Sequence, residues 1–314
     1  MSPGPLVDLH PDVAAAVADG RPVVALESTL IAHGMPWPRN AETAFALQAR
    51  VREGGAVPAT IAVVGGRLKA GLDDGSIETL ARAGAAVPKL SRRDLGWALA
   101  RGGLGATTVA ATMIVAERAG IRFFATGGIG GVHRGAPASF DISADLLELA
   151  RTPVAVVCAG AKAILDLPLT LEVLETHGVP VIGWQTDELP AFYSRSSGLR
   201  VPLRADAPDE LARLLAAHWG CGLGSGVVVA QPIPAAHELP RERVEAAISQ
   251  ALAEADAQGI RGKASTPFLL ERVAALTGGD SLEANVALVL ANAGLAARLA
   301  CAWRVRGGGM DGVH

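Results

Sequence analysis

The sequence predicts an α/β fold: a single domain with a central, largely parallel β-sheet flanked by helices on both faces. Apolar segments of strand length alternate with segments of helix length, which is typical of crossover units. The predicted strands show no polar alternation, so both of their faces are expected to be buried. Half of the residues are hydrophobic but only 4% are aromatic, so we expect a core of Ala, Val, Leu and Ile, with 37 glycines serving the turns.

No repeat, linker or break in composition divides the chain. This favours one domain over residues 1–306, followed by a glycine-rich tail at 307–314 that is expected to be disordered. The formal charge of −3 comes from 28 basic and 31 acidic residues without a basic block, so no nucleic-acid partner is expected. The N-terminus lacks the pattern of a secretory signal. The apolar tract 284–300 is short and carries polar residues, so we expect a buried helix and no membrane partner.

The cysteines Cys158, Cys221 and Cys301 are odd in number and lack C-x-x-C spacing. Such a set indicates neither a disulfide framework nor a zinc site. Free thiols suit a reducing compartment, so a cytoplasmic location is expected.

The N-terminal part is predicted to run through helix, strand, helix and hairpin. In order, the expected elements are a helix at 11–19, a buried strand at 23–26, an irregular loop at 33–39, a helix from an Asn40 cap to Glu53, and strands at 60–64 and 67–72. Prolines and a glycine forbid regular structure in the loop. Gly65-Gly66 between the two strands is typical of a hairpin.

Serine caps and an extended piece mark the next part of the chain. Ser76 and Ser91 are each expected to cap a helix, the second with Asp94 three residues later. The elements expected around and after them are an extended piece at 87–90, an apolar helix at 105–118 and a buried strand at 123–125.

The second half is predicted to continue the alternation. The expected elements are a helix at 144–150 capped by Ser143, a strand at 153–158, a helix ending near His177, a strand at 179–184, a helix at 208–219, a strand at 226–230, helices at 241–258 and 266–276, and a last helix after a Ser281 cap. Ligands of such sheets bind beyond the carboxyl ends of the strands. Polar or glycine-rich groups follow five predicted strands there: Glu27, Thr126-Gly127, the turn before Lys162, Gln185 to Asp187, and Gln231.

A glycine-rich loop follows the strand at 123–125. Five glycines fall within residues 127–135, so backbone N–H groups there are expected to approach an anion. His133 and Arg134 lie inside the loop. The glycine spacing is not that of a dinucleotide-binding loop, which disfavours such a cofactor.

Three polar residues follow this loop at alternate positions: Asp141, Ser143 and Asp145. Helix capping and the helix dipole explain Ser143 and Asp145 equally well as a binding role does. They do not explain Asp141, a hard oxygen ligand of the kind that holds Mg²⁺ or Mn²⁺ together with water.

Lys162 and Glu27 are the candidate catalytic residues. Lys162 follows a long apolar run, and apolar surroundings disfavour the charged amine and leave the free amine available for Schiff-base formation with a sugar aldehyde. The alternative is a lysine that extends from a helix start to solvent. Glu27 ends a buried strand, where partial burial favours the protonated carboxyl of a proton donor. A cap or an ion pair would explain Glu27 as well.

Other polar residues are candidates for binding. Lys89 and His133 are cations that could meet a phosphate, although Lys89 could be an ordinary exposed lysine. Asn285 lies on an otherwise apolar helix face, and a buried amide needs partners. Backbone groups or the edge of a base could satisfy it.

Seven motifs together resemble one family, the pseudouridine-5'-phosphate glycosidases, also called indigoidine synthase A-like proteins. They cover nearly the whole chain in order: ALESTLIAHGMP at 25–36, GATTVAATM at 105–113, FATGGIGGVHRG at 124–135, DISADL at 141–146, CAGAK at 158–162, KASTPFLL at 263–270 and LEANVAL at 282–288.

The resemblance implies reversible cleavage of the C–C glycosidic bond of pseudouridine 5'-phosphate to uracil and ribose 5-phosphate. It places the nucleophile on Lys162, the proton donor on Glu27 and the divalent metal ligand on Asp141. It places substrate contacts on Lys89, Val109, Ser143, Ala144 and Asp145. Thr126 and His133 are expected on the phosphate side and Asn285 at the uracil.

The resemblance further implies a homotrimer that uses Mn²⁺ or another divalent cation such as Mg²⁺. His237 departs from the family pattern, which has an acidic residue there, and the tail has no counterpart. Two alternatives stay open: a Schiff-base sugar-phosphate aldolase or lyase, and a nucleotide-sensing module without turnover, which would need neither Glu27 nor Lys162.

Overall fold

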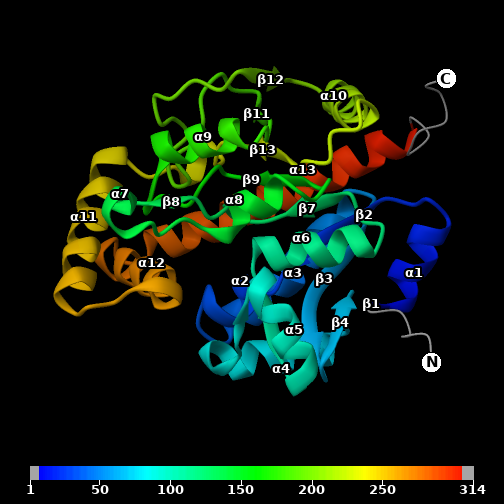
Figure 1. Ribbon diagram of the computed structural model, residues 1–314, viewed down its shortest axis with the longest axis horizontal. Helices are drawn as coiled ribbons and strands as arrows, with labels where there is room; N and C mark the ends of the chain where they lie inside the picture. Colours follow the sequence, from blue (N-terminus) through cyan, green and yellow to red (C-terminus); the bar gives the residue numbers. More distant parts are fainter. Residues whose placement is uncertain (1–6, 306–314) are drawn as a thin grey trace.

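A central β-sheet organises the protein, whose computed structural model describes residues 7–305 (Figure 1). The sheet has eleven strands: β1 (Val7–Leu9), β2 (Val23–Glu27), β3 (Val57–Val64), β4 (Arg67–Ala70), β5 (Lys89–Leu90), β6 (Gly105–Thr107), β7 (Phe123–Ala125), β9 (Ala155–Cys158), β11 (Val181–Trp184), β12 (Leu203–Ala205) and β13 (Val227–Ala230). The main order is β1-β4-β3-β2-β7-β9-β13-β11-β12, with β6 beside β3 and β5 beside β6.

Every neighbouring pair from β3 to β12 is parallel. The exceptions lie at the β3 edge, where β4 and β6 run antiparallel to β3. The hairpin predicted at Gly65-Gly66 joins β3 and β4, and both glycines have positive φ. A largely parallel sheet is confirmed. The predicted tail at 307–314 lies outside the described residues.

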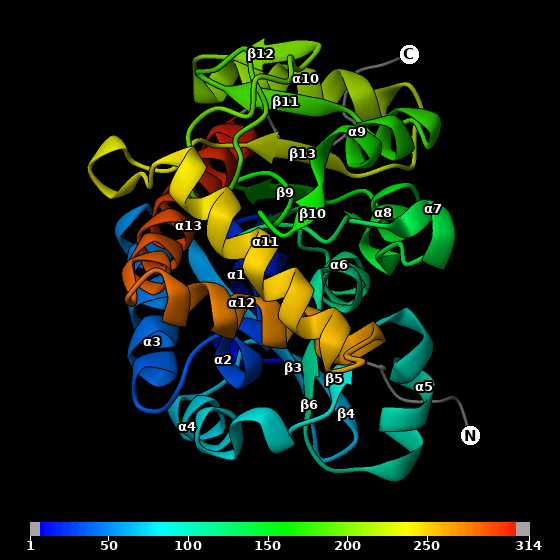
Figure 2. The same cartoon turned by 90° about the vertical axis from the view of Figure 1, so that its left-hand side faces the viewer.

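Helices cover both faces of the sheet, as predicted. The helices are α1 (Pro11–Ala18), α2 (Thr29–His33), α3 (Arg39–Glu53), α4 (Asp74–Ala83), α5 (Arg92–Arg101), α6 (Val109–Arg118), α7 (Ala136–Ser139), α8 (Ala144–Leu149), α9 (Leu167–Thr176), α10 (Pro208–Gly220), α11 (Arg241–Ala257), α12 (Ser265–Leu276) and α13 (Asp280–Val305). Figure 2 shows α3 and α13 on one side of the strands and α6, α8 and α9 on the other. A small ribbon of β8 (Val132–His133) and β10 (Leu165–Asp166) lies outside the sheet.

The core is built from aliphatic residues because the central strands are buried on both faces. Every residue of β2, β7, β9, β11 and β13 is buried. The helix α13 packs against β2, β7 and β9. Within residues 7–305 it alone is long and apolar enough to cross a bilayer, but 61% of its most apolar window is buried inside the protein. The predicted buried helix at 284–300 is therefore confirmed.

Three predicted helix caps and one predicted helix start differ in the structure because of local contacts. Asn40 lies inside α3, where its buried amide donates to the carbonyls of Ile31 and Ala81. Asp73, not Ser76, caps α4 by accepting the Ser76 N–H at 2.7 Å. Ser281 is buried within the first turn of α13.

The segment predicted as one helix at 105–118 divides at Thr108. Gly105–Thr107 pairs with β3 and β5 as strand β6, and Thr108 then caps α6. The start of the predicted loop at 33–39 also differs, since His33 ends the short helix α2. The box of Ser91 and Asp94 at the start of α5 is confirmed.

Candidate active site

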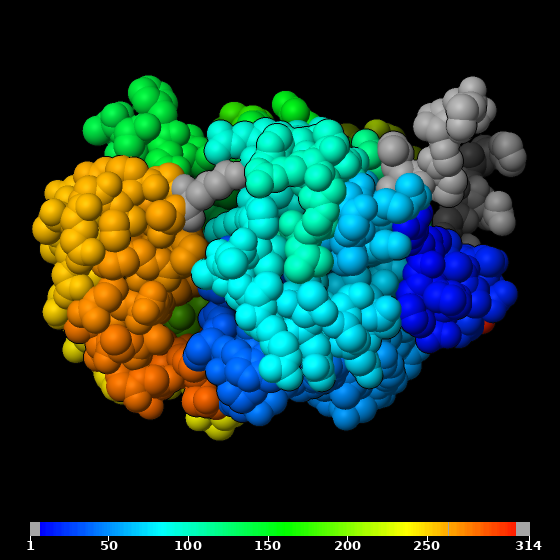
Figure 3. Space-filling model, turned by 90° about the horizontal axis from the view of Figure 1, so that it is seen from below, coloured from blue at the N-terminus to red at the C-terminus, as the bar shows by residue number. Residues whose placement is uncertain are grey.

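A cavity of about 470 Å³ opens beyond the carboxyl ends of β2, β7 and β9. It brings together ten predicted site residues: Glu27, Lys89, Val109, His133, Asp141, Ser143, Ala144, Asp145, Lys162 and Asn285. Figure 3 shows a hollow between α12, in orange, and the cyan segment that contains α5. Residues of both elements line the cavity, among them Arg93 and Leu270.

Glu27 is the last residue of β2, so the strand delivers its carboxyl to the cavity wall. Its side chain is nearly buried. Thr29 Oγ1 donates a hydrogen bond to Oε2 and Thr126 Oγ1 donates one to Oε1. Thr126 is itself buried and does not line the cavity. The predicted phosphate-side role of Thr126 is therefore not what this geometry indicates, because its hydroxyl is directed at Glu27.

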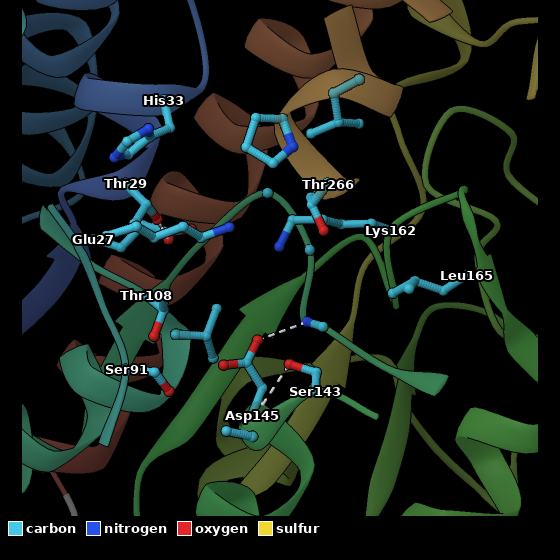
Figure 4. Close-up of a pocket in the computed structure, with 18 of the residues that line it drawn as sticks. Glu27, Thr29, His33, Ser91, Thr108, Ser143, Asp145, Lys162, Leu165 and Thr266 are labelled. Atoms are coloured by element: carbon cyan, nitrogen blue, oxygen red, sulfur yellow. Dashed lines mark hydrogen bonds between the residues drawn. The ribbon is translucent and has the colours of Figure 1, made fainter. Parts of the chain in front are cut away.

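Lys162 is held by a turn that stays paired with the glycine-rich loop beyond the ends of β7 and β9. Ala159 N donates to Gly127 O, Ile129 N to Gly160 O, and Lys162 N to Ile129 O at 3.1 Å. Lys162 does not start a helix, because α9 begins only at Leu167. In Figure 4, Glu27 and Lys162 lie on opposite sides of the cavity, with the Lys162 side chain extending into it.

The tight conformation of this turn depends on Gly160. Its φ is +82°, and a Cβ placed there would lie 2.6 Å from the Pro190 carbonyl oxygen. A side chain at this position would therefore displace the segment that presents Lys162.

The glycine-rich loop uses several of its amides inside the protein. Gly130 N donates to Asp145 Oδ2 at 2.8 Å, Val132 N to Thr170 Oγ1 at 3.0 Å, and His133 N to the Asp141 carbonyl at 3.0 Å. The anion that approaches Gly130 is thus the carboxylate of the protein itself. These three amides donate to acceptors of the protein itself, so for them the prediction of an external anion is wrong.

Close packing accounts for two of the glycines. A Cβ on Gly130 would lie 2.1 Å from Ser143 Oγ, and one on Gly131 would lie 2.4 Å from Thr170 Oγ1. Contacts this short cannot be relieved by small shifts, so these positions require glycine.

Asp145 links three segments at the base of the site. It accepts Gly130 N–H on Oδ2 and Ala110 N–H, in the first turn of α6, on Oδ1 at 2.9 Å. Ser143 caps α8, as predicted, by accepting the Asp145 N–H at 3.2 Å. The position of Ser143 is therefore explained by helix capping. Asp145 holds the glycine-rich loop and α6 in place relative to each other. Figure 4 shows both residues at the floor of the cavity.

Lys89, Lys162 and Asp141 line the cavity close enough to His133 to act on it electrostatically. Burial is the main cause that lowers the pKa of His133, nearby Lys162 and Lys89 lower it further, and Asp141 opposes them. The His133 imidazole is therefore favoured in its neutral form. The half-buried Asp141 lies next to it on the cavity wall.

Asn285 reaches the cavity from α13. It is buried, and its Oδ1 has no hydrogen-bond partner among the described residues. A Cβ on Gly127 would lie 3.2 Å from this oxygen, so the amide faces the glycine-rich loop. A buried amide without a partner costs free energy that a bound ligand could recover.

Cavity residues that the sequence did not indicate come from short or irregular segments. The cavity also contains Thr29 and His33, one helical turn apart on α2. His33 Nε2 lies 2.9 Å from the Val87 carbonyl oxygen, which accepts only, so Nε2 carries the proton. Burial first and Lys89 second lower the pKa of His33.

Two further cavity residues are placed by contacts between segments far apart in sequence. Arg92 forms a two-pronged ion pair with the buried Glu148, at 2.6 and 2.7 Å. This partner raises the pKa of Arg92. Phe192 has φ +65° and its ring packs against Gly128. No spacing in the sequence could have revealed these contacts.

Two predicted strand-end groups lie outside the cavity. Asp187 pairs with Arg204 at 2.8 Å, and Gln185 Nε2 donates to the Asp206 carbonyl. Neither they nor Gln231 line the cavity. His237 belongs to a short 3₁₀ turn over Ala235–His237 and is not a lining residue either.

The chain matches known proteins over almost its whole length. The family model described as indigoidine synthase A like protein matches residues 12–302. A pseudouridine-5'-phosphate glycosidase of Hahella chejuensis is 61% identical over 95% of this chain and 98% of its own. The protein of that name from Escherichia coli K12 is 58% identical over 94% of this chain and 95% of its own.

Solved structures share the fold. The prealnumycin C-glycosynthase AlnA, in complex with ribulose 5-phosphate, has a TM-score of 0.90 and 45% identity, covering 97% of this chain and 99% of that chain. An indigoidine synthase A-like protein from Thermotoga maritima has a TM-score of 0.85 and 33% identity, covering 94% and 95%. The resemblance carried by the seven motifs is thus confirmed, and the chain belongs to the indigoidine synthase A like protein family.

Proposed function

We propose that this protein reversibly cleaves the C–C glycosidic bond of pseudouridine 5'-phosphate, giving uracil and ribose 5-phosphate. The observation that carries the proposal is one cavity with Glu27 and Lys162 on opposite sides, which Lys89 and Arg92 also line. Relatives about 60% identical over nearly the full chain carry the name of this activity. A structural relative named a C-glycosynthase was solved with a sugar phosphate.

Lys162 is the proposed nucleophile. A C-glycoside has no heteroatom between base and sugar for an acid to protonate, so cleavage needs an electron source at C1'. The Lys162 amine attacks C1' as the C1'–O4' bond breaks, and a proton passes from the nitrogen to O4', which opens the sugar and leaves a neutral secondary amine. The lone pair of the amine then forms the C1'=N bond while the C1'–C5 bond breaks. Water hydrolyses the imine and releases ribose 5-phosphate.

Glu27 is the proposed proton donor. Uracil can leave only if C5 gains a proton, and protonation of carbon is slow without a positioned acid. Glu27 ends its strand on the wall opposite Lys162, so a sugar held by the lysine would place the base near the carboxyl.

The remaining wall supplies groups for both ends of the substrate. We propose that Lys89 and His133 lie toward the phosphate, with the start of α6 at Val109 and the segment Ser143 to Asp145 contacting the sugar phosphate. Asn285 is proposed to bind uracil, because its unpartnered Oδ1 can accept an N–H of the base.

Asp141 is the proposed ligand of a divalent cation, Mn²⁺ or Mg²⁺. No group of three or more His, Cys, Asp or Glu side chains within residues 7–305 could hold a metal, so a cage made only of protein is not what the site offers. A half-buried carboxylate on the cavity wall fits a cation that keeps water and substrate oxygens as its other ligands. Such an ion would neutralise phosphate charge.

A uracil-release assay tests the function. The protein is incubated with pseudouridine 5'-phosphate and Mn²⁺, and free uracil and ribose 5-phosphate are measured. An aldolase or lyase would instead act on a sugar phosphate alone, and a sensor would bind the nucleotide without turnover. We also propose a homotrimer, from the resemblance, and a cytoplasmic location, from the free thiols; light scattering would check the oligomeric state.

A further inference from the structure

Two threonine hydroxyls hold the carboxylate of Glu27, and their surroundings differ. Thr126 Oγ1 donates to Oε1, and Thr29 Oγ1 donates to Oε2. Thr126 is 1% exposed and lies behind the cavity wall, whereas Thr29 is 9% exposed and lines the cavity. Oε1 thus faces the protein interior, and Oε2 lies on the side of the cavity.

Both backbone polar groups of Thr126 are hydrogen-bonded. Its N–H donates to the Val157 carbonyl at 3.0 Å, and its carbonyl accepts Asn292 Nδ2 at 2.8 Å. Thr29 instead occupies the first position of the short helix α2, where a backbone N–H has no partner within the helix. Of the two threonines, Thr29 has fewer backbone contacts and is the one that borders the cavity.

A hydroxyl carries one hydrogen, which limits how Glu27 can be protonated. While both threonines donate, both carboxylate oxygens accept, which suits the ionised form. When the carboxyl takes up a proton, the threonine beside the protonated oxygen must turn and accept instead. Its hydrogen then needs another acceptor, which water or substrate in the cavity can supply to Thr29 but not to the buried Thr126, so the change falls on Thr29.

We propose that Thr29 is a positioning residue that makes Oε2 the proton-bearing oxygen of Glu27. Its hydroxyl accepts from the carboxylic acid before cleavage and donates to the carboxylate afterwards. This inference rests on the function proposed above. The proton passes from Oε2 to C5 of uracil, the C1'–C5 electron pair restores the C5=C6 bond, and the lone pair of Lys162 forms the C1'=N bond.

The test compares uracil release by the wild type, Thr29→Val and Thr29→Ser. Valine keeps the shape of the side chain but removes the hydroxyl, whereas serine keeps the hydroxyl. A hydrogen bond to a charged group corresponds to roughly 10- to 100-fold in rate, so kcat of Thr29→Val should fall by about that factor with little change in KM. Thr29→Ser should retain most of the wild-type kcat.

Borohydride trapping separates positioning from a structural defect. Imine formation between ribose 5-phosphate and Lys162 does not require protonation of a base, so Thr29→Val should trap as the wild type does. Thr176→Val is the matched control, since the Thr176 hydroxyl bonds the Glu172 carbonyl on an exposed helix end and should leave kcat unchanged.

Several results would overturn the role of Thr29. These are wild-type kcat in Thr29→Val, equal loss in Thr29→Ser, a change confined to KM, or loss of trapping together with turnover. A wild-type protein that releases no uracil would instead refute the proposed function, and the role of Thr29 with it.

Discussion

Asp145 accepts the backbone N–H of Gly130 at 2.8 Å, so a carboxylate of the chain occupies the position where an external anion was expected. The same side chain accepts the Ala110 N–H. Asp145→Ala should leave the buried Ala110 N–H and the part-buried Gly130 N–H unpaired, and an unpaired buried donor costs about 1–3 kcal/mol. Urea unfolding should show this loss, while the exposed Asp12→Ala should stay near wild type. Equal stability of Asp145→Ala and the wild type would contradict this linking role.

Lys162 should be the site of covalent trapping. Borohydride added to the protein with ribose 5-phosphate should leave a mass increment on the peptide that contains Lys162, because reduction fixes the imine as an amine. Lys162→Ala should show no increment. Lys69→Ala is a suitable control, since Lys69 on β4 pairs with Asp8 on β1 and does not line the cavity. An adduct on another lysine would reassign the nucleophile.

Asp141→Asn should lose the response to divalent cations. EDTA is expected to lower uracil release by the wild type and Mn²⁺ to restore it, since a neutral amide is a weaker ligand for a hard cation. Asp187→Asn, which removes an exposed ion pair outside the cavity, should respond as the wild type does. Full activity of carefully demetallated wild-type protein would refute the metal proposal.

The folded protein should lose stability as the pH falls below about 6.5, and His33 should contribute. Burial, followed by Lys89, lowers the pKa of His33 below its ordinary 6.5, so the unfolded chain binds this proton more readily than the folded chain. The effect is absent above pH 6.5 and grows as the pH falls toward the folded-state pKa. Urea unfolding from pH 8 to pH 5 should show a smaller decline in His33→Gln, whose amide can still donate to Val87. An unchanged decline would exclude His33 as a cause.

One of the three cysteines should react rapidly with Ellman's reagent in the native protein. Cys221 is exposed, whereas burial raises the pKa of Cys158 to about 12 and also raises that of Cys301. A buried thiol with a raised pKa yields little thiolate. Cys221→Ser should abolish the rapid phase, and unfolding of the wild type should expose all three thiols. Rapid reaction of a second native thiol would contradict the burial of the other two.

The sequence predicts the sheet well because its strands are buried on both faces. The runs of β9 and β13 are continuously apolar, and the polar or glycine-rich group that follows each run marks its carboxyl end. Glu27 and the turn before Lys162 could be placed at one edge for this reason. Gln231 follows the same pattern but does not line the cavity, because pattern alone does not tell which strand ends are central.

The rest of the site depends on contacts that no spacing encodes. The five-residue helix α2 is too short for a periodic signal, so the sequence does not indicate Thr29 and His33 as cavity residues. The sequence predicts an external anion at the glycine-rich loop because it cannot show that Asp145 accepts the Gly130 N–H. The resemblance predicts Thr126 on the phosphate side because the sequence cannot show that its hydroxyl donates to Glu27.

The helix α13 is synthesised after the strands that it covers, and this order affects the nascent chain. It covers β2, β7 and β9 and contributes Asn285 to the cavity, yet it is the last element among the described residues. While the ribosome is still making it, the finished strands present an apolar face with nothing on it. Nascent chains that stall before Asp280 should therefore be inactive and prone to associate, and chaperones should bind them until translation resumes.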